Sequence, residues 1–166
     1  MEWGNNQELF FSELEIGHSW AEYVAAKLNE NEVPCYATEM RKALTKEEIK
    51  EFRNEKDVVL TGMAGCIEVK SRRLRFSDSP SSFPMDSAFV DTVSGWGFKD
   101  PRPLAVCIVS QFTGSILVVP VSTQSQWGQV YKFDRVRKIN DTWFTCPKSL
   151  LKPFSELVSW LRARQV

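Results

Sequence analysis

Apolar residues recur with helical spacing near both ends of this chain, and between the ends they form short runs typical of strands. Within residues 17–30, apolar residues recur at four-residue intervals, as at Val24 and Leu28, and this spacing predicts an amphipathic helix. Residues 5–15 show the same tendency only weakly. Residues 154–161 have a clean apolar stripe and predict a C-terminal helix.

The strand-like runs fill the middle of the chain. Residues 104–110 are apolar at every position but the last, so we expect a central strand that is buried on both faces. Thr45 and Glu48 have capping-box spacing and predict a short polar helix or turn over residues 46–54. The predicted strands are residues 35–40, 57–61, 66–76, 104–110 and 115–121, with shorter ones at 129–133 and 142–146.

The order of these elements predicts one layered α/β or α+β domain. It spans residues 1–166, with a core over 17–121 and C-terminal strands and a helix over 129–164. The Ser- and Pro-rich residues 77–87 read as a loop, and residues 88–93 fit a helix or a strand equally well.

Composition excludes several classes of protein. A chain of 166 residues with 43% hydrophobic and 25% charged residues can bury a stable core, so disorder is not expected. Four scattered cysteines and a single histidine argue against a zinc site and favour reduced thiols. No apolar run is long enough to span a membrane. We therefore expect a cytoplasmic protein that does not associate with membranes.

The net charge of zero conceals an asymmetry. The first 32 residues hold seven acidic residues and one lysine, so the excess of Lys and Arg lies in the rest of the chain. A basic face of this kind can contact phosphate groups. It can equally be an ordinary solvated surface, and charge alone favours that simpler interpretation.

Charged residues interrupt the second and third predicted strands in a regular way. Asp57 opens the second strand, and Glu68 and Lys70 lie on the third. Because side chains alternate along a strand, Glu68 and Lys70 share one face while Ile67 and Val69 occupy the other. A hairpin would bring Asp57 close to Glu68. Ionised groups beside a sheet core are costly unless they are paired or bound to a metal ion.

This pattern resembles the PD-(D/E)XK nuclease superfamily, which includes restriction endonucleases, Holliday-junction resolvases and small phage-encoded nucleases. The resemblance covers residues 17–121 and is strongest over 57–72, although Lys56 stands where the family name has proline. It implies a restriction-endonuclease-like mixed central sheet of about five strands flanked by helices. It also implies a metal-dependent deoxyribonuclease, intracellular and of the phage type.

The resemblance assigns roles to individual residues. Asp57, Glu68 and the Val69 carbonyl would bind Mg²⁺, for which Mn²⁺ would substitute, because hard oxygen ligands suit this ion. Lys70 would hold the attacking water or neutralise charge on the phosphate. Glu22, in the leading helix, would orient Lys70 or hold a second ion through water.

Three further residues are candidates for contacts with DNA. Arg72 and Arg73 follow the motif directly and suit phosphate groups. Gln111 ends the central strand, where it reaches the site or merely caps a turn. RNA remains open as a substrate, as do endo- or exonucleolytic and branched or linear targets. A homodimer is one assembly that the resemblance implies.

Two alternatives belong to other classes of function. The first is a catalytically inactive nuclease-fold module that binds nucleic acid or a protein partner. The second is an unrelated α/β interaction protein in which Asp57, Glu68 and Lys70 form only a surface salt bridge. Glu22 has a plain alternative as well, as a solvated helix residue.

Overall fold

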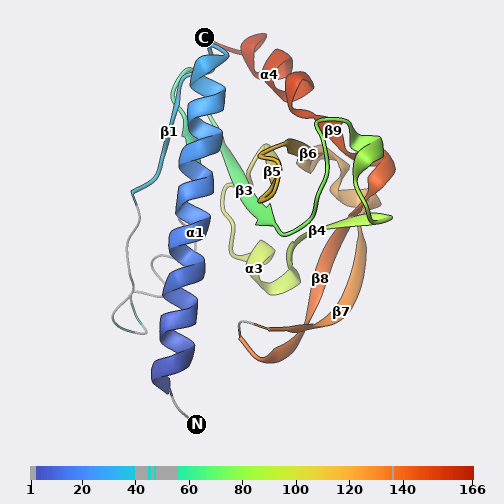
Figure 1. Ribbon diagram of the computed structural model, residues 1–166. Helices are drawn as coiled ribbons and strands as arrows, with labels where there is room; N and C mark the ends of the chain where they lie inside the picture. The colour runs from blue at the N-terminus through green and yellow to red at the C-terminus, as the bar shows by residue number, and fades with distance from the viewer. Residues whose placement is uncertain (1–2, 40–44, 46, 48–55, 136) are drawn as a thin grey trace.

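The structure is a computed structural model that describes residues 3–39, 45, 47, 56–135 and 137–166. Its centre is a mixed six-stranded sheet in the order β1-β2-β3-β5-β6-β9 (Figure 1). β3 and β5 pair in parallel and every other neighbouring pair is antiparallel. The strands are β1 (Cys35–Ala37), β2 (Val58–Leu60), β3 (Cys66–Arg72), β5 (Ala105–Ser110), β6 (Ile116–Pro120) and β9 (Lys152–Pro153).

A second, antiparallel sheet has the order β4-β8-β7. Residues 88–93, whose sequence fits a helix or a strand equally well, form most of strand β4. The β7–β8 hairpin extends away from the central sheet (Figure 1). Its strands are β4 (Ser87–Thr92), β7 (Gly128–Asp134) and β8 (Ile139–Pro147), and the short helix α3 (Val93–Gly97) follows β4. The described connections include three 3₁₀ turns: η1 (Pro80–Ser82), η2 (Val121–Gln126) and η3 (Lys148–Leu150).

One face of the central sheet is covered by helices. The long helix α1 (Trp3–Glu30) and the C-terminal helix α4 (Phe154–Arg162) both bury apolar side chains against it. The stripe predicted over residues 17–30 is confirmed, since Val24 and Leu28 are fully buried. Burying each such side chain contributes roughly 1.5–3 kcal/mol. None of the described helices is long and apolar enough to cross a membrane.

The opposite face of the central sheet carries a second core. β5 is buried at all six positions, which confirms it as a central strand, and its side chains alternate between the two cores. Cys107 and Val109 pack toward α1, whereas Val106 and Ile108 pack toward the second sheet and Trp96 of α3.

Some predictions need correction or stay open. β3 ends at Arg72 instead of continuing to residue 76. The weakly helical residues 5–15 belong to one continuous α1. Of the helix or turn predicted over residues 46–54, the structure describes only residue 47, so that prediction stays open. The fold is thus a mixed α/β single domain with six strands in its main sheet.

Candidate functional site

The turn between β2 and β3 fixes where the charged residues point. Gly65 has a backbone φ of +135°, a conformation that residues with a side chain rarely adopt. A Cβ atom there would also lie 2.6 Å from Leu104 Cδ1. The turn sets Val58 opposite Ile67, so Asp57, one residue earlier, comes opposite Glu68. The hairpin predicted from the sequence is therefore confirmed.

Asp57 is anchored to β3 by a backbone hydrogen bond. The Val69 N–H donates to Asp57 Oδ2 at 2.8 Å. Burial raises the pKa of Asp57 to about 7, and the nearby negative charge of Glu68 adds to the rise. Asp57 thus sits in a position that disfavours its own negative charge at neutral pH.

Glu68 and Lys70 occupy the face of β3 that lies away from α1. In the parallel register Glu68 lies beside Val106 and Lys70 beside Ile108, whose side chains belong to the second core. Lys70 Nζ lies 3.2 Å from Glu68 Oε1, and Glu68 is only 7% exposed. A buried carboxylate and a largely buried ammonium group therefore form a pair within an apolar surface.

Two residues that sequence reasoning missed complete this group. Lys99 Nζ donates to Glu68 Oε1 at 2.9 Å and lies 3.6 Å from Asp91 Oδ2. Asp91 Oδ2 is also 4.0 Å from Lys70 Nζ. We call Asp57, Glu68, Lys70, Asp91 and Lys99 the charged cluster. It holds three carboxylates and two ammonium groups.

The ammonium groups and the carboxylates shift one another's pKa values. Burial raises the pKa of Glu68, but the positive charges of Lys70 and Lys99 outweigh it and lower that pKa below its ordinary value. Burial likewise lowers the pKa of Lys70, but Glu68 and Asp91 outweigh it and raise that pKa. Around neutral pH Glu68 is therefore ionised and Lys70 positively charged.

The local sequence gives one signal for Asp91 and none for Lys99. Asp91 is an acid within the otherwise mostly apolar run 88–93, and its Oδ1 accepts the Thr92 N–H at 2.8 Å. Thr92 caps α3 by accepting the Gly95 N–H. Lys99 follows α3 in a turn, and only the path of the chain through 93–99 brings it back to β3.

The structure does not bring Glu22 to the charged cluster. Its side chain is 62% exposed, and Glu22 Oε1 lies 2.8 Å from His18 Nε2 on the same helix. α1 packs against the face of β3 that carries Ile67 and Val69, which is opposite to Glu68 and Lys70. This environment matches the plain alternative of a solvated helix residue.

The residues predicted to contact DNA lie in different places. Arg72 is half-buried beyond Lys70 and donates from Nη2 to the Phe89 carbonyl of β4 at 3.1 Å. Arg73 is exposed. Gln111 Nε2 donates to Ser71 Oγ at 2.9 Å, and Ser71 lies on the α1 side of β3 by alternation. Gln111 is therefore directed away from the charged cluster.

The charged cluster offers few oxygen ligands, so a Mg²⁺ ion bound there would complete its six-fold coordination with waters. Within the described residues, no group of three or more Asp, Glu, His and Cys side chains has the geometry to hold a metal ion. Mg²⁺ commonly uses only one or two carboxylates and keeps several waters. Asp57 and Glu68 supply such a pair, and the Val69 C=O points to the same strand edge as the N–H that Asp57 accepts. Asp57, Glu68 and the Val69 carbonyl are therefore the groups that would hold the ion, and Lys70 and Lys99 already contact Glu68.

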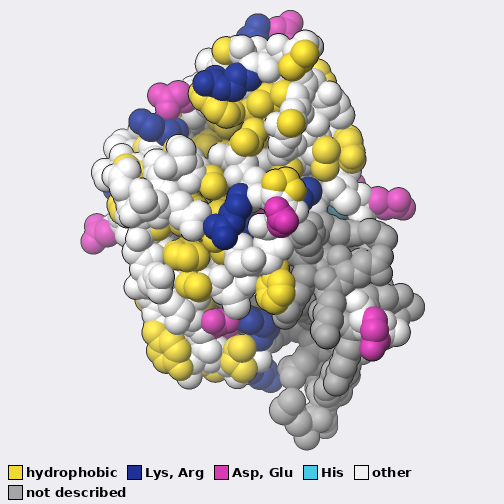
Figure 2. Space-filling model, turned by 180° about the vertical axis from the view of Figure 1, so that it is seen from behind, with side chains coloured by type: hydrophobic (Ala, Val, Ile, Leu, Met, Phe, Trp, Pro, Cys, Tyr) yellow, Lys and Arg dark blue, Asp and Glu magenta, His cyan; other side chains and the backbone are white. Residues whose placement is uncertain are grey.

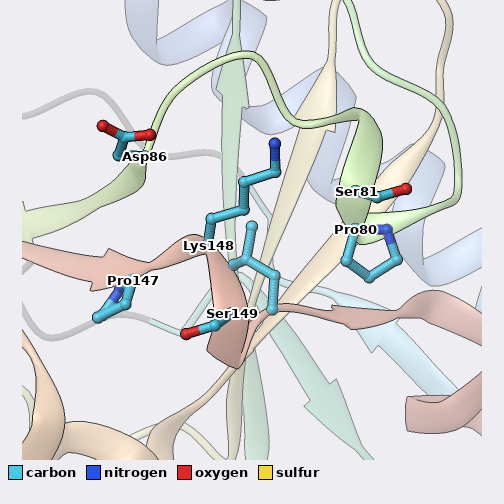
Figure 3. A pocket seen from close by; sticks show the side chains of 7 residues that line it. Pro80, Ser81, Asp86, Pro147, Lys148 and Ser149 are labelled. Atoms are coloured by element: carbon cyan, nitrogen blue, oxygen red, sulfur yellow. The ribbon is translucent and has the colours of Figure 1, made fainter.

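The surface of the described residues includes two hollows of similar volume. Figure 3 shows one of about 540 Å³ beside η1 and η3, where the Lys148 side chain rises past Ser81 and Pro80. It contains none of the charged cluster. The other, of about 520 Å³, lies between the end of β3 and the β7–β8 hairpin. We call it the hairpin groove; its lining includes Arg72, Arg73, Lys132, Arg135, Phe89, Phe133 and Trp143.

Comparisons with known proteins identify no relative of this chain. No protein-family model matches it. No curated protein and no solved structure matches it either. The charged cluster and its surroundings are therefore the basis for a functional assignment.

Proposed function

We propose that this protein is a metal-dependent deoxyribonuclease that hydrolyses phosphodiester bonds at the charged cluster. The observation behind the proposal is the juxtaposition of Asp57 and Glu68 on paired strands, with Lys70 Nζ 3.2 Å from Glu68. Two carboxylates and an ammonium group on one sheet face form a suitable set for binding a divalent ion and a phosphate together.

The topology supports the finer fold assignment, a restriction-endonuclease-like domain. A leading helix precedes three antiparallel strands, and β5 then returns parallel to β3. Asp57 directly precedes β2 and Glu68 lies on β3, close to the positions that the resemblance implies. A strand and the short helix α3 occupy the connection between β3 and β5.

The residues of the site divide the work of hydrolysis. Asp57, Glu68 and the Val69 carbonyl would hold Mg²⁺, which when bound supplies a water of lowered pKa and positive charge at the phosphate. Lys70 places a fixed positive charge where negative charge develops on the phosphate oxygens. Lys99 orients the Glu68 carboxylate through their hydrogen bond.

One observation favours the second candidate, a nuclease-fold module that binds without cutting. Glu68 already pairs with Lys70 and Lys99, so a divalent ion would compete with two ammonium groups for one carboxylate. In such a module the cluster would be a closed salt-bridge network. It would show no turnover with any divalent ion.

Cleavage of DNA separates the two candidates. Linear, circular, single-stranded and branched DNA, with an RNA strand alongside, are incubated with Mg²⁺, with Mn²⁺ or with chelator. We expect cleavage that requires the metal and falls about 100- to 1,000-fold in Lys70→Ala. Lys152→Ala is the matched control, because Lys152 is exposed on β9. Metal-dependent cleavage that survives in Lys70→Ala would falsify the assigned mechanism, and no cleavage at all would favour the binding module.

A further inference from the structure

We propose that the hairpin groove binds an unpaired strand of nucleic acid and leads it to the charged cluster. The inference rests on the proposed function, because it identifies the strand in the groove as the substrate. It goes beyond the proposed function by specifying that the substrate is single-stranded and not a duplex. Three features of the groove support it: its charge, its aromatic lining and its continuity with the cluster.

The charge of the groove suits a polyanion. Four basic residues line it, and three of them are arginines, whose planar guanidinium groups suit phosphate oxygens. The one acid in the lining, Asp134, has its charge compensated, since Arg137 Nε lies 2.7 Å from Asp134 Oδ2. In the described part of the chain, no carboxylate forms an ion pair with Arg73 or Arg135. Their positive charges remain available to a ligand.

The aromatic lining distinguishes a single strand from a duplex. Phe89 packs edge-on against Trp143, with ring centroids 6.0 Å apart, and Lys132 Nζ lies 4.4 Å from the Phe89 centroid. Phe133 is 50% exposed. A duplex hides the faces of its bases, whereas an unpaired strand offers them to aromatic and guanidinium groups along with its phosphates. A lining of cations and aromatic rings therefore matches an unpaired strand better.

The groove begins where the charged cluster ends. Arg72 lies two residues after Lys70 on the same face of β3 and hydrogen-bonds to Phe89. Phe89 in turn lies two residues before Asp91 on β4. A strand whose phosphates follow Arg73 and Arg72 thus arrives at Lys70. Figure 2 shows hydrophobic, basic and acidic side chains together toward the lower end of the described surface, where the hairpin extends.

Binding is measured by fluorescence anisotropy in chelator, so that no cleavage occurs. The probes are a fluorescein-labelled 20-nucleotide oligothymidylate and a labelled duplex of the same length. We expect the single strand to bind at least about tenfold more tightly than the duplex. With three to four phosphate contacts, the logarithm of the binding constant should fall with log salt at a slope of about −2 to −3.

Variants locate the binding surface. The double variant Arg73→Glu/Arg135→Glu should weaken oligothymidylate binding more than tenfold, and Phe133→Ala about five- to 100-fold, which corresponds to the stacking of one base. Arg164→Glu is the matched control, because Arg164 is exposed at the end of α4, outside the groove, and its variant should bind like the wild type. All these side chains are exposed, so the variants should melt at the wild-type temperature.

Several outcomes would overturn the inference. These are equal affinity for the duplex, no binding to either probe, and equal losses in the groove variants and Arg164→Glu. A fourth is a wild-type dimer that Phe133→Ala dissociates while no oligonucleotide binds, since the hairpin would then be a contact between copies. The proposed function fails separately: groove-dependent binding in chelator without cleavage in Mn²⁺ contradicts the nuclease and leaves the binding site in place.

Discussion

The two faces of β3 are built from neighbouring residues and have opposite characters. Ile67 and Val69 lie in the apolar core beneath α1, and Ile67 is fully buried. Glu68 and Lys70 alternate with them and form an ion pair on the other face, beside the apolar residues of β5. The face with Ile67 and Val69 is the apolar surface that a strand needs in order to pack in a core. The face with Glu68 and Lys70 instead carries charge where the adjacent strand β5 carries Val106 and Ile108.

The difference matters because buried ion pairs add little to stability. The desolvation of two charges offsets much of their attraction, and apolar replacements of similar volume are often neutral or stabilising. The second face of β3 is thus not explained by folding alone. A site that binds a divalent ion and phosphate gives a reason for retaining charged groups there.

The largest expected effect comes from the apolar face. Ile67→Ala deletes a fully buried side chain between β3 and α1 and should lower the free energy of unfolding by about 2–5 kcal/mol. Chemical denaturation measures this loss. Because the charged cluster lies on the other face, cleavage by the folded fraction at low temperature should stay within about threefold of wild type. A much larger loss of cleavage by folded protein would show that the two faces are not separable.

The next effect concerns Lys99 on the charged face. Lys99→Met removes one of the two ammonium groups from Glu68 but keeps a side chain of similar length. We expect the metal-free protein to lose about 1–3 kcal/mol of stability, because a buried carboxylate loses a charged hydrogen-bond partner. Denaturation with and without Mn²⁺ measures the effect, and Mn²⁺ should restore more stability to the variant than it adds to wild type. Equal stabilisation of both proteins by Mn²⁺ would mean that Lys99 and the ion do not compete for Glu68.

An effect of similar size to that of Lys99→Met is a pH dependence that belongs to Asp57. Its pKa is raised from 3.8 to about 7, so the folded protein binds more protons than the unfolded chain between these values, and metal-free stability falls as pH rises through this window. Asp57→Asn removes the charge and can still accept the Val69 N–H. The variant should therefore gain stability over wild type as pH rises from 5 to 8, on the order of 2 kcal/mol.

Thermal melting of metal-free wild type and Asp57→Asn across that pH range measures the difference. Glu156→Gln, an exposed acid on α4, is the matched control and should show no such trend. A constant difference between wild type and Asp57→Asn at all pH values would mean that Asp57 is ionised throughout.

Much of the fold was predictable because its signals are local. The apolar period around Val24 and Leu28 and the continuous apolar run 104–110 each depend on one segment, and the structure confirms both. The alternation of Glu68 and Lys70 with Ile67 and Val69 also follows from strand geometry alone, and it too is confirmed.

The rest of the site was not predictable because it depends on long-range chain paths. Lys99 reaches Glu68 across 31 residues of sequence, through a strand and a helix with no signal that ties them to β3. Glu22 shows the converse: it lies in the expected helix, but the stripe that buries Val24 turns it to solvent. Local periodicity places a residue on a face, and only the tertiary packing shows what that face meets.

The most direct test of the charged face is divalent-ion binding, measured by titration calorimetry with Mn²⁺ on the intact chain. We expect one site per chain, at least about tenfold weaker in Asp57→Asn and in Glu68→Gln, since each variant loses one carboxylate ligand. The Glu156→Gln control should bind Mn²⁺ like wild type. Binding that is absent from wild type, or unchanged in both cluster variants, would contradict a shared ion site between Asp57 and Glu68.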